Sequence, residues 1–491
     1  MVLAPAARLR AAAGDLDLSF GTGGKVTTTF ATGSLDSCKA LVLQTDGKLV
    51  AGGETFREGL FLARYDSSGI LDPTFGSAGK VLVPVGIGHL GVPDDTLNDL
   101  VLQPDGKLVG LGSFDDQTLA PLRTVLIRWN SNGTLDPTFG NGGGVLTADV
   151  TDRRLALQTD GKLLALGSSL LRRYNANGTL DTTFDNGSGG GTFITSLVPA
   201  RDLAVQAGGK IVVTGTSGGP LGKDFAVERF EANGNYDPTF GVAGVATASL
   251  GMFDEPFAIA IQSDGKIVVA GGTGTGPSDA RIGLARWDAN GTLDGTFGTG
   301  GTLTGPLGVP QSMAVRPDGA IVVVGYVGTP SHFIVARFLS NGAPDAAYGS
   351  GGFVTTAFGS DADVAYDLVL QPDGKVVAAG LATSATADFG LARFLDGPPA
   401  STTTTSTSPS TTSTTLLCPA DPDLDGICTP VDNCPTVANP DQSNINGNGY
   451  GDACDPNDAG VNLTFARLRR SSNPSDPNGT IKCEGSFVTN P

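Results

Sequence analysis

The chain has 491 residues, with 31 lysines and arginines against 49 aspartates and glutamates, so its formal net charge is −18. This charge repels phosphate backbones and anionic lipid headgroups, which makes nucleic acid and membrane surfaces poor candidates for partners. Glycine is abundant at 72 residues and methionine is scarce at 3, a composition typical of a turn-rich all-β protein. No apolar run approaches the roughly 20 residues of a membrane helix, so we expect no membrane insertion.

The N-terminal segment, residues 1–14, contains Arg8, Arg10 and many alanines but no continuous apolar stretch. A secretory signal needs about 7–15 consecutive apolar residues. No such signal is visible in this chain, and the sequence leaves the export route open.

One unit occurs seven times between residues 15 and 397. Its anchor is an apolar run ending in Gln (Arg in one copy), a turn that is usually Asp-Gly-Lys, and a second apolar run ending in Gly. The anchors are LVLQTDGKLVAGG (41–53), LVLQPDGKLVGLG (100–112), LALQTDGKLLALG (155–167), LAVQAGGKIVVTG (203–215), IAIQSDGKIVVAG (259–271), MAVRPDGAIVVVG (313–325) and LVLQPDGKVVAAG (368–380). Such self-similarity at a period of about 48 to 59 residues indicates a repeat architecture.

Each anchor is followed by a strand that ends in arginine and an aromatic residue, such as Arg64-Tyr65 or Arg286-Trp287. A tight turn, usually Asn-Gly, leads to a Leu-Asp-Pro-Thr-Phe-Gly segment and a short Gly-Gly-x-Val strand. Asn-Gly accepts positive φ at both central positions, so it favours a two-residue hairpin turn. Consecutive apolar residues, as at 321–324, predict strands buried on both faces. Four antiparallel strands per unit, repeated radially, predict an all-β fold, a seven-bladed β-propeller.

The seventh unit ends at residues 393–397, before any Leu-Asp-x-x-Phe-Gly segment. The missing segment occurs at the other end of the chain, at residues 16–21, followed by Gly-Gly-Lys-Val at 23–26. We therefore expect residues 15–30 to complete the blade of residues 361–397, so that the propeller is closed by the N-terminal strand. Closure would remove the exposed sheet edges of an open array.

The unit resembles the bacterial delta-60 repeat family, through its paired Leu-Asp-x-x-Phe-Gly and Gln-x-Asp-Gly-Lys motifs. The resemblance covers roughly residues 16–397. It implies a propeller-like, secreted or surface protein, and the family has no assigned biochemical activity. The third unit departs most, since Asp185 follows Phe184 where other units have glycine, and the fourth has Gly208 in place of the turn aspartate.

Residues 398–417 form a Ser/Thr/Pro-rich linker, of the kind that separates extracellular domains. The segment 418–458 then carries two loops with the spacing of calcium ligands: oxygen donors at positions 1, 3, 5 and 12, a glycine at 6 and a backbone carbonyl at 7. The first loop comprises Asp421, Asp423, Asp425, Asp432 and the carbonyl of Ile427. The second comprises Asn444, Asn446, Asn448, Asp452, Asp455 and the carbonyl of Tyr450. Asparagine replaces three carboxylates in the second loop, so we expect it to bind Ca²⁺ more weakly.

This segment resembles a thrombospondin type 3 repeat, whose words Asp-x-Asp-x-Asp-Gly, Asp-Asn-Cys-Pro and Gly-Asp-Ala-Cys-Asp it contains. The resemblance implies an irregular module that wraps calcium ions, with a disulfide between Cys434 and Cys454. Cys418 and Cys428 are a further candidate disulfide pair, and Cys483 and Cys38 are unassigned. Five of the six cysteines lie in the last 75 residues, as expected of a small module in an oxidising compartment. Residues 459–491 form an unassigned C-terminal tail.

Several repeated residues have both a functional and a structural interpretation. The arginines could form a basic ligand-binding ring, but we favour structural ion pairs with the following Leu-Asp motif, as between Arg64 and Asp72 or Arg128 and Asp136. The Asp-Gly-Lys turns and the Asn-Gly-Thr sequons at Asn132, Asn177 and Asn290 are explained by turn chemistry. The only histidines, His89 and His332, are expected in variable loops without an adjacent nucleophile or acid.

These features predict a non-enzymatic extracellular or cell-surface binding or adhesion protein. The propeller would present loops to an unknown protein or glycan ligand, and the Ca²⁺ module would act as a spacer. We expect a monomer. The alternative is a secreted propeller enzyme that acts on polysaccharide as a lyase or hydrolase, which an acid or histidine cluster in the central mouth would favour. A third possibility is a purely structural coat protein.

Overall fold

The computed structural model describes residues 12–30, 35–55, 59–83, 96–114, 123–147, 152–184, 191–218, 222–275, 279–383, 387–397, 468–470 and 481–483. The chain divides into two units, Met1–Thr402 and Thr403–Pro491. The division falls within the predicted Ser/Thr-rich linker.

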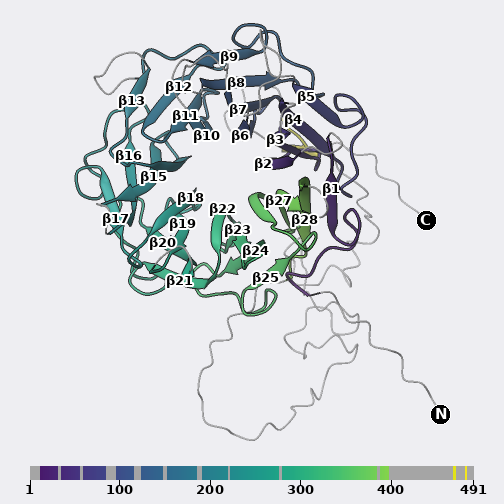
Figure 1. Ribbon diagram of the computed structural model, residues 1–491. Helices are drawn as coiled ribbons and strands as arrows, with labels where there is room; N and C mark the ends of the chain where they lie inside the picture. Colours follow the sequence, from purple (N-terminus) through teal and green to yellow (C-terminus); the bar gives the residue numbers. More distant parts are fainter. Residues whose placement is uncertain are drawn as a thin grey trace, which may run out of the picture. The chain divides into compact units, whose positions relative to one another are not determined.

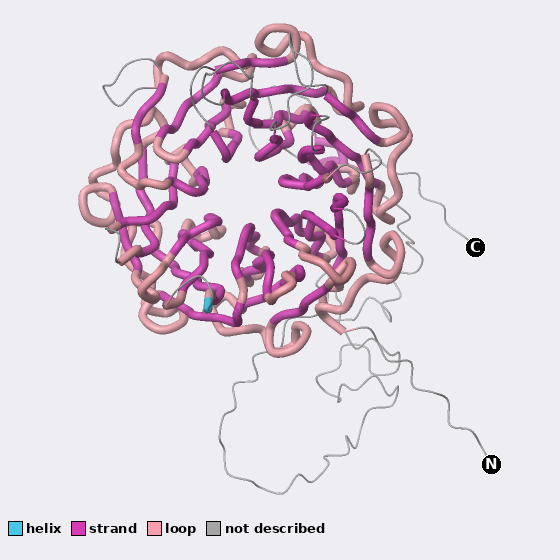
Figure 2. The backbone as a smooth tube through the Cα atoms, in the orientation of Figure 1, coloured by secondary structure: helices cyan, strands magenta, loops and turns pink. Residues whose placement is uncertain are grey.

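The first unit is a ring of seven four-stranded antiparallel sheets (Figure 1). Turns and loops lie along its outer rim, and the first strand of each sheet lies nearest the centre (Figure 2). From the inner to the outer strand, the sheets are β2 (Asp36–Leu43), β3 (Leu49–Thr55), β4 (Gly59–Tyr65), β5 (Lys80–Val83); β6 (Thr96–Leu102), β7 (Leu108–Phe114), β8 (Arg123–Trp129), β9 (Gly144–Thr147); β10 (Asp152–Leu157), β11 (Leu163–Gly167), β12 (Leu170–Tyr174), β13 (Thr192–Ile194); β14 (Ala200–Val205), β15 (Ile211–Ser217), β16 (Asp224–Phe230), β17 (Val245–Ala248); β18 (Glu255–Ile261), β19 (Ile267–Thr273), β20 (Arg281–Trp287), β21 (Thr302–Leu307); β22 (Val309–Val315), β23 (Ile321–Val327), β24 (His332–Phe338), β25 (Phe353–Thr356); and β26 (Val364–Leu370), β27 (Val376–Thr383), β28 (Ala387–Phe394), β1 (Lys25–Thr28). The prediction of an all-β, seven-bladed propeller is confirmed.

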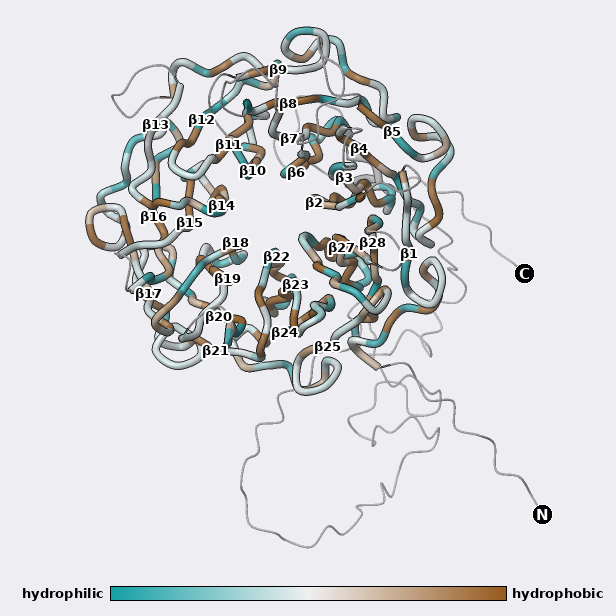
Figure 3. Tube along the Cα trace, viewed as in Figure 1, coloured by the Kyte–Doolittle hydropathy of each residue, from teal (hydrophilic) through white to brown (hydrophobic). Residues whose placement is uncertain are grey.

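The hydrophobic core lies between adjacent blades, and hydrophobic residues follow the strands around the whole ring (Figure 3). Val322 and Val323 are neighbours on β23, and both are fully buried. Val322 packs in one cluster with Ala378 of the following blade, while Val323 packs in another with Val268 of the preceding blade. Successive side chains point to opposite faces of a sheet. A blade packed between two neighbouring blades therefore needs apolar residues at consecutive positions. This confirms that the apolar runs are buried on both faces.

The seventh sheet combines both ends of the propeller unit. β1 pairs antiparallel with β28, with Lys25 opposite Ala392 and Thr28 opposite Phe389. The backbone N–H of Asp17 also donates to the carbonyl of Arg393 at 2.8 Å. β1 occupies the outer position that β5 occupies in the first sheet.

In the second unit, the described residues form a two-stranded antiparallel pair, β29 (Leu468–Arg470) and β30 (Ile481–Cys483). These six residues lie in the C-terminal tail, residues 459–491, which has no assignment from the sequence. Within the described ranges, the chain contains no helix with the length and apolar character needed to span a bilayer.

Candidate functional site

The predicted calcium ligands and the cysteines predicted to form disulfides all lie outside the described residues. Within the described residues, no group of three or more histidine, cysteine or acidic side chains is arranged to hold a metal ion. Cys38 is buried on β2 with a free thiol. The candidate site must therefore be built from the propeller itself.

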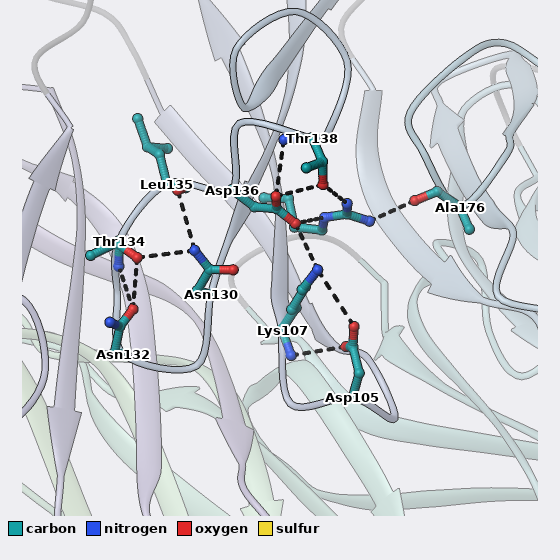
Figure 4. A network of polar contacts seen from close by, with 10 residues as sticks. Asp105, Lys107, Asn130, Asn132, Thr134, Leu135, Asp136, Thr138 and Ala176 are labelled. Carbon is teal, nitrogen blue, oxygen red and sulfur yellow. Dashed lines mark hydrogen bonds and ion pairs between the residues drawn. The ribbon is translucent and has the colours of Figure 1, made fainter.

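The repeated arginines belong to the framework, as shown for the second blade in Figure 4. Arg128 donates from Nε to Asp136 Oδ2 at 2.8 Å and from Nη1 to the carbonyl of Ala176, in the next blade, at 2.6 Å. Its guanidinium also lies 4.6 Å from the ring centroid of Phe139. Lys107, from the Asp-Gly-Lys turn, approaches the same carboxylate at 2.9 Å. The arginine therefore joins two blades, and its charge is already neutralised.

The same bond from arginine Nε to an aspartate Oδ2 occurs in all seven blades. The pairs are Arg64–Asp72, Arg128–Asp136, Arg173–Asp181, Arg229–Asp237, Arg286–Asp294, Arg337–Asp345 and Arg393–Asp17. Burial alone would raise the pKa of Asp136, but hydrogen bonds from Thr138 and Lys107 and the charge of Arg128 hold it well below its ordinary value. The structural interpretation of these arginines is confirmed.

Every inner strand carries a β-bulge at one repeated position. In β2 the pairing with β3 passes from Cys38 to Ala40, so Lys39 has no partner in the ladder. Such an extra residue bends the strand and re-aims its side chain. The seven bulged residues are Lys39, Asn98, Arg153, Arg201, Phe257, Gln311 and Tyr366.

The final glycine of the anchor permits this bulge. Gly380 lies opposite Ala365, the residue before the bulge, and a Cβ at Gly380 would lie only 1.9 Å from the carbonyl oxygen of Val364. The equivalent distances are 1.9 Å at Gly53 and 2.0 Å at Gly325. No Cβ tolerates such an approach, so the backbones can come this close only at glycine. All seven anchors end in glycine, which gives that part of the motif a physical reason.

The seven bulged side chains line one cavity of about 280 Å³, which we call the channel mouth. The remaining lining residues are Arg154, Ser168, Pro199 and Ala200. The lining thus contains four basic side chains and no acidic one, although the chain carries a net charge of −18. Because the seven bulges come from seven blades, every blade contributes a side chain to the mouth.

The basic and aromatic residues of the mouth lie close to each other. The Lys39 ammonium lies 3.9 Å from the ring centroid of Tyr366, and the Arg201 guanidinium lies 5.6 Å from that of Phe257. Lys39 also pairs with Glu54 at 3.5 Å, and Arg201 pairs with Glu255. Cations near aromatic faces are held by the ring quadrupole, so these contacts orient both partners.

Three aspartates follow the bulge by one residue in their strands: Asp99, Asp202 and Asp367. Each accepts the backbone N–H of the next residue and an N–H from a neighbouring inner strand, as Asp202 does from Leu203 and Ile259, both at 2.9 Å. Burial raises the pKa of Asp99 to about 7 and that of Asp202 to about 6, against the opposing charge of Arg154. These carboxyls tie one blade to the next along the channel.

The Asn-Gly-Thr sequons and His332 both lie within the described residues. At Asn132 the Oδ1 atom accepts the Thr134 hydroxyl at 2.7 Å, so the sequon forms a turn, as predicted. His332 was expected in a loop without an adjacent acid, and this was wrong. It is the first residue of β24, and its Nδ1 lies 3.7 Å from Asp363 Oδ2, which the following blade brings close. His89 lies outside the described residues.

The channel mouth is not among the sites predicted from the sequence. Its signal was present: two residues before each anchor, the repeat has a different residue in almost every copy, while the anchor itself hardly varies. Because the residue type at this position varies from blade to blade, the fold of the blade does not depend on it. The bulge directs these side chains into one cavity. It arises from the pairing of two strands, so it cannot be recognised in the sequence of one strand.

Comparison with known proteins supports the fold. Six segments match the family described as "Domain of unknown function (DUF5122) beta-propeller": residues 44–75, 103–139, 158–184, 262–297, 316–348 and 371–395. No functionally curated protein matches the chain.

Similar solved structures share little sequence with this chain. A protein of unknown function from Dyadobacter fermentans is 13% identical, covering 76% of this chain and 98% of its own, with a TM-score of 0.40. Sqt1 from Chaetomium thermophilum is 13% identical over 74% and 98%, with a TM-score of 0.41. A gluconolactonase from Xanthomonas campestris is 14% identical over 59% and 82%, with a TM-score of 0.33. The ring of seven sheets and the family match together show a repeat-built, seven-bladed β-propeller protein whose blades are similar to the DUF5122 propeller domain.

Proposed function

We propose that this chain is a non-enzymatic extracellular or cell-surface binding protein, with the channel mouth of its propeller as the binding site. The proposal is supported by a contrast within the repeat between residues that hold the blades together and residues that line the mouth. The repeated arginines, aspartates and lysines are used in bonds within and between blades, whereas the seven bulged residues differ and converge on one cavity. A surface of varied side chains on a rigid scaffold is what a specific binding site requires.

In more detail, we propose a propeller of delta-60 repeats that is closed by its N-terminal strand and followed by a thrombospondin type 3-like module. The Ser/Thr-rich linker, the clustered cysteines and the two calcium-ligand spacings support an extracellular location. In this arrangement the module binds Ca²⁺ and acts as a spacer, and the protein is a monomer whose partner is a protein or a glycan.

A polysaccharide lyase or hydrolase is the second candidate, because Asp99 and Asp202 have raised pKa values along the channel, and a general acid needs such a pKa. Against it, both oxygens of Asp99 accept backbone N–H groups, from Leu100 and Leu155. A carboxyl occupied in this way is a poor proton donor to a substrate. The same contact recurs at Asp202 and Asp367, as expected of a framework residue.

Glycan and protein arrays probed with the full chain, with and without calcium, test the binding function. A variant carrying both Phe257→Ala and Tyr366→Ala changes the mouth, and Val242→Ala at a residue that is 84% exposed is the matched control. We expect at least one ligand class to bind wild type and the control but not the double variant. Identical array profiles for all three proteins would reject the mouth as the site, and turnover of an arrayed polysaccharide would favour the enzyme.

A further inference from the structure

The channel mouth also indicates the chemistry of its ligand, and this inference depends on the function proposed above. Three of its four cations have acidic partners: Lys39 pairs with Glu54, Arg201 with Glu255, and Arg154 lies 3.6 Å from Asp202. The fourth, Arg153, is exposed and has no ion-pair partner among the residues that the structure describes. Arg153 therefore brings an uncompensated positive charge to the cavity.

A second polar group in the mouth lacks a partner. Arg201 Nε is buried and makes no hydrogen bond, while the other end of its guanidinium is held by Glu255. A buried N–H without an acceptor costs free energy, so Glu255 does not fully satisfy the Arg201 guanidinium, which can take a further acceptor. Arg153 and Arg201 are the bulged residues of adjacent blades, because β10 and β14 are neighbouring inner strands (Figure 3). Together they make one side of the mouth a site for an anion.

The rest of the mouth is aromatic and amide in character, apart from Lys39, which pairs with Glu54. Phe257, Gln311 and Tyr366 come from the three consecutive blades after Arg201, and Asn98 comes from the blade before Arg153. Aromatic rings pack against the apolar face of a sugar ring, while side-chain amides donate to and accept from hydroxyl groups. The volume of about 280 Å³ is just below the range of roughly 300–1,000 Å³ that holds a drug-sized ligand. It suits one sugar ring, not a longer chain.

We propose that the channel mouth binds a single carboxylated sugar unit, free or at the end of a glycan. Arg153 and the Arg201 guanidinium would hold the carboxylate, and Tyr366 or Phe257 would cover one face of the ring. Arginine suits this role because its fixed fork of donors matches the two oxygens of a carboxylate. A peptide would need a longer groove, and a phosphate would need no aromatic surface.

Calorimetric titration of the full chain with glucuronate, glucose, acetate and glucose 6-phosphate tests this inference. We expect glucuronate to bind at millimolar concentration or below, and at least about tenfold more tightly than the other three. Arg153→Ala should weaken glucuronate about tenfold or more, since a hydrogen bond to a charged group contributes that much. Arg281→Ala, an exposed arginine outside the mouth that donates to the carbonyl of Gly305, is the matched control and should change nothing.

Failure of glucuronate to bind, or equal binding of acetate, would overturn the inference, as would tighter binding of glucose 6-phosphate. Equal loss in Arg153→Ala and Arg281→Ala would also overturn it, because the effect would then be long-range charge. The melting temperatures of both variants must match that of wild type, and Arg153→Lys, which keeps the charge but not the fork, should retain only part of the affinity. If the arrays reveal a partner that depends on the mouth while glucuronate fails, only the ligand class is wrong.

Discussion

Arg393 donates a hydrogen bond from Nε to Asp17 Oδ2 at 3.0 Å, across 376 residues of chain. In each of the other six blades the same bond joins an arginine to an aspartate eight residues later, as from Arg64 to Asp72 at 3.0 Å. Lys375 lies 3.2 Å from Asp17, as Lys48 lies 3.0 Å from Asp72. The N-terminal segment thus gives the last blade the acid that other blades take from their own continuing chain.

If this segment closes the ring, Asp17→Ala should destabilise the propeller as much as Asp72→Ala. Either substitution leaves a buried arginine without its acid, which typically costs about 3–5 kcal/mol. Urea unfolding measures the free energy. The control is Asp46→Ala, since Asp46 is 53% exposed and should matter by less than about 0.5 kcal/mol. An Asp17→Ala protein as stable as the Asp46→Ala control would show that the N-terminal strand does not hold the ring.

The bulges should depend on their facing glycines. In Gly380→Ala the new Cβ would lie 1.9 Å from the Val364 carbonyl and 2.9 Å from Ala365 Cα, so the backbone must move. We expect a loss of at least about 2–3 kcal/mol in unfolding free energy. Gly295→Ala, whose Cβ would meet nothing within 4 Å, is the control and should be neutral. Equal stabilities for the two variants would contradict our explanation of the anchor glycine.

The blade count, the four strands per blade and the arginine–aspartate pairs could be predicted because they are local and repeated. Asn-Gly turns, apolar runs and the spacing of eight residues between Arg64 and Asp72 lie within one unit of the sequence. Because the motif occurs seven times, it can still be recognised where one copy differs, as at Asp185 in the third unit. Local pattern and global fold agree, as expected of a sequence with one native state.

The channel mouth could not be predicted because it is assembled from residues about 50 positions apart, at positions where the repeat varies. Asp363 beside His332 is a similar case, since a neighbouring blade supplies the acid. The glycine that ends each anchor was visible as a pattern. Its reason, a carbonyl oxygen too close for any Cβ, appears only when β26 and β27 are paired.

The contact between the sixth and seventh blades carries a compensated set of changes. Arg316 replaces the glutamine of the anchor, Ala320 replaces the lysine, and Asp396 stands where other blades offer a turn carbonyl to the arginine. Arg316 lies 2.7 Å from Asp396, which also accepts from Arg337.

A double-mutant cycle of Arg316→Gln and Asp396→Ala should therefore show a coupling of about 1–3 kcal/mol, because the two groups share a partly buried network. The same cycle on Lys80 and Asp46, which pair with other residues and not with each other in the described part of the propeller, should show none. Additive effects of Arg316→Gln and Asp396→Ala would mean that the two replacements are independent.

Calcium binding is testable on the full chain by calorimetry. Extracellular calcium modules typically bind at about 10⁻⁴–10⁻³ M, so saturation is expected in the millimolar range. Asp423→Ala removes a predicted ligand of the first loop and should abolish its heat, whereas Asp458→Ala, outside both ligand sets, should leave the titration unchanged. Absence of heat from wild-type protein at 10 mM calcium, a concentration about tenfold above that range, would reject the module as a calcium site.

Two sets of aspartates should give stability opposite dependences on pH. Hydrogen bonds from Ser19 and Lys375 and the charge of Arg393 outweigh burial and lower the pKa of Asp17 to about 2, from an ordinary value of 3.8. Stability from this group is present above pH 3.8 and is lost as the pH falls toward 2. Burial raises the pKa of Asp99 to about 7, so its contribution is complete below pH 3.8 and is lost as the pH rises through 7.

The free energy of unfolding should therefore pass through a maximum near pH 4, falling steeply in more acidic solution and more gently as the pH rises toward 7. Asp99→Asn carries no titrating proton, so its stability relative to wild type should improve as the pH rises from 5 to 8. Urea unfolding at both pH values measures this difference. Asp105→Asn, at an exposed turn acid with 56% of its side chain accessible, should show the same difference from wild type at both. A constant offset for Asp99→Asn would mean that this carboxyl is already ionised at pH 5, and that the channel does not hold it in its neutral form.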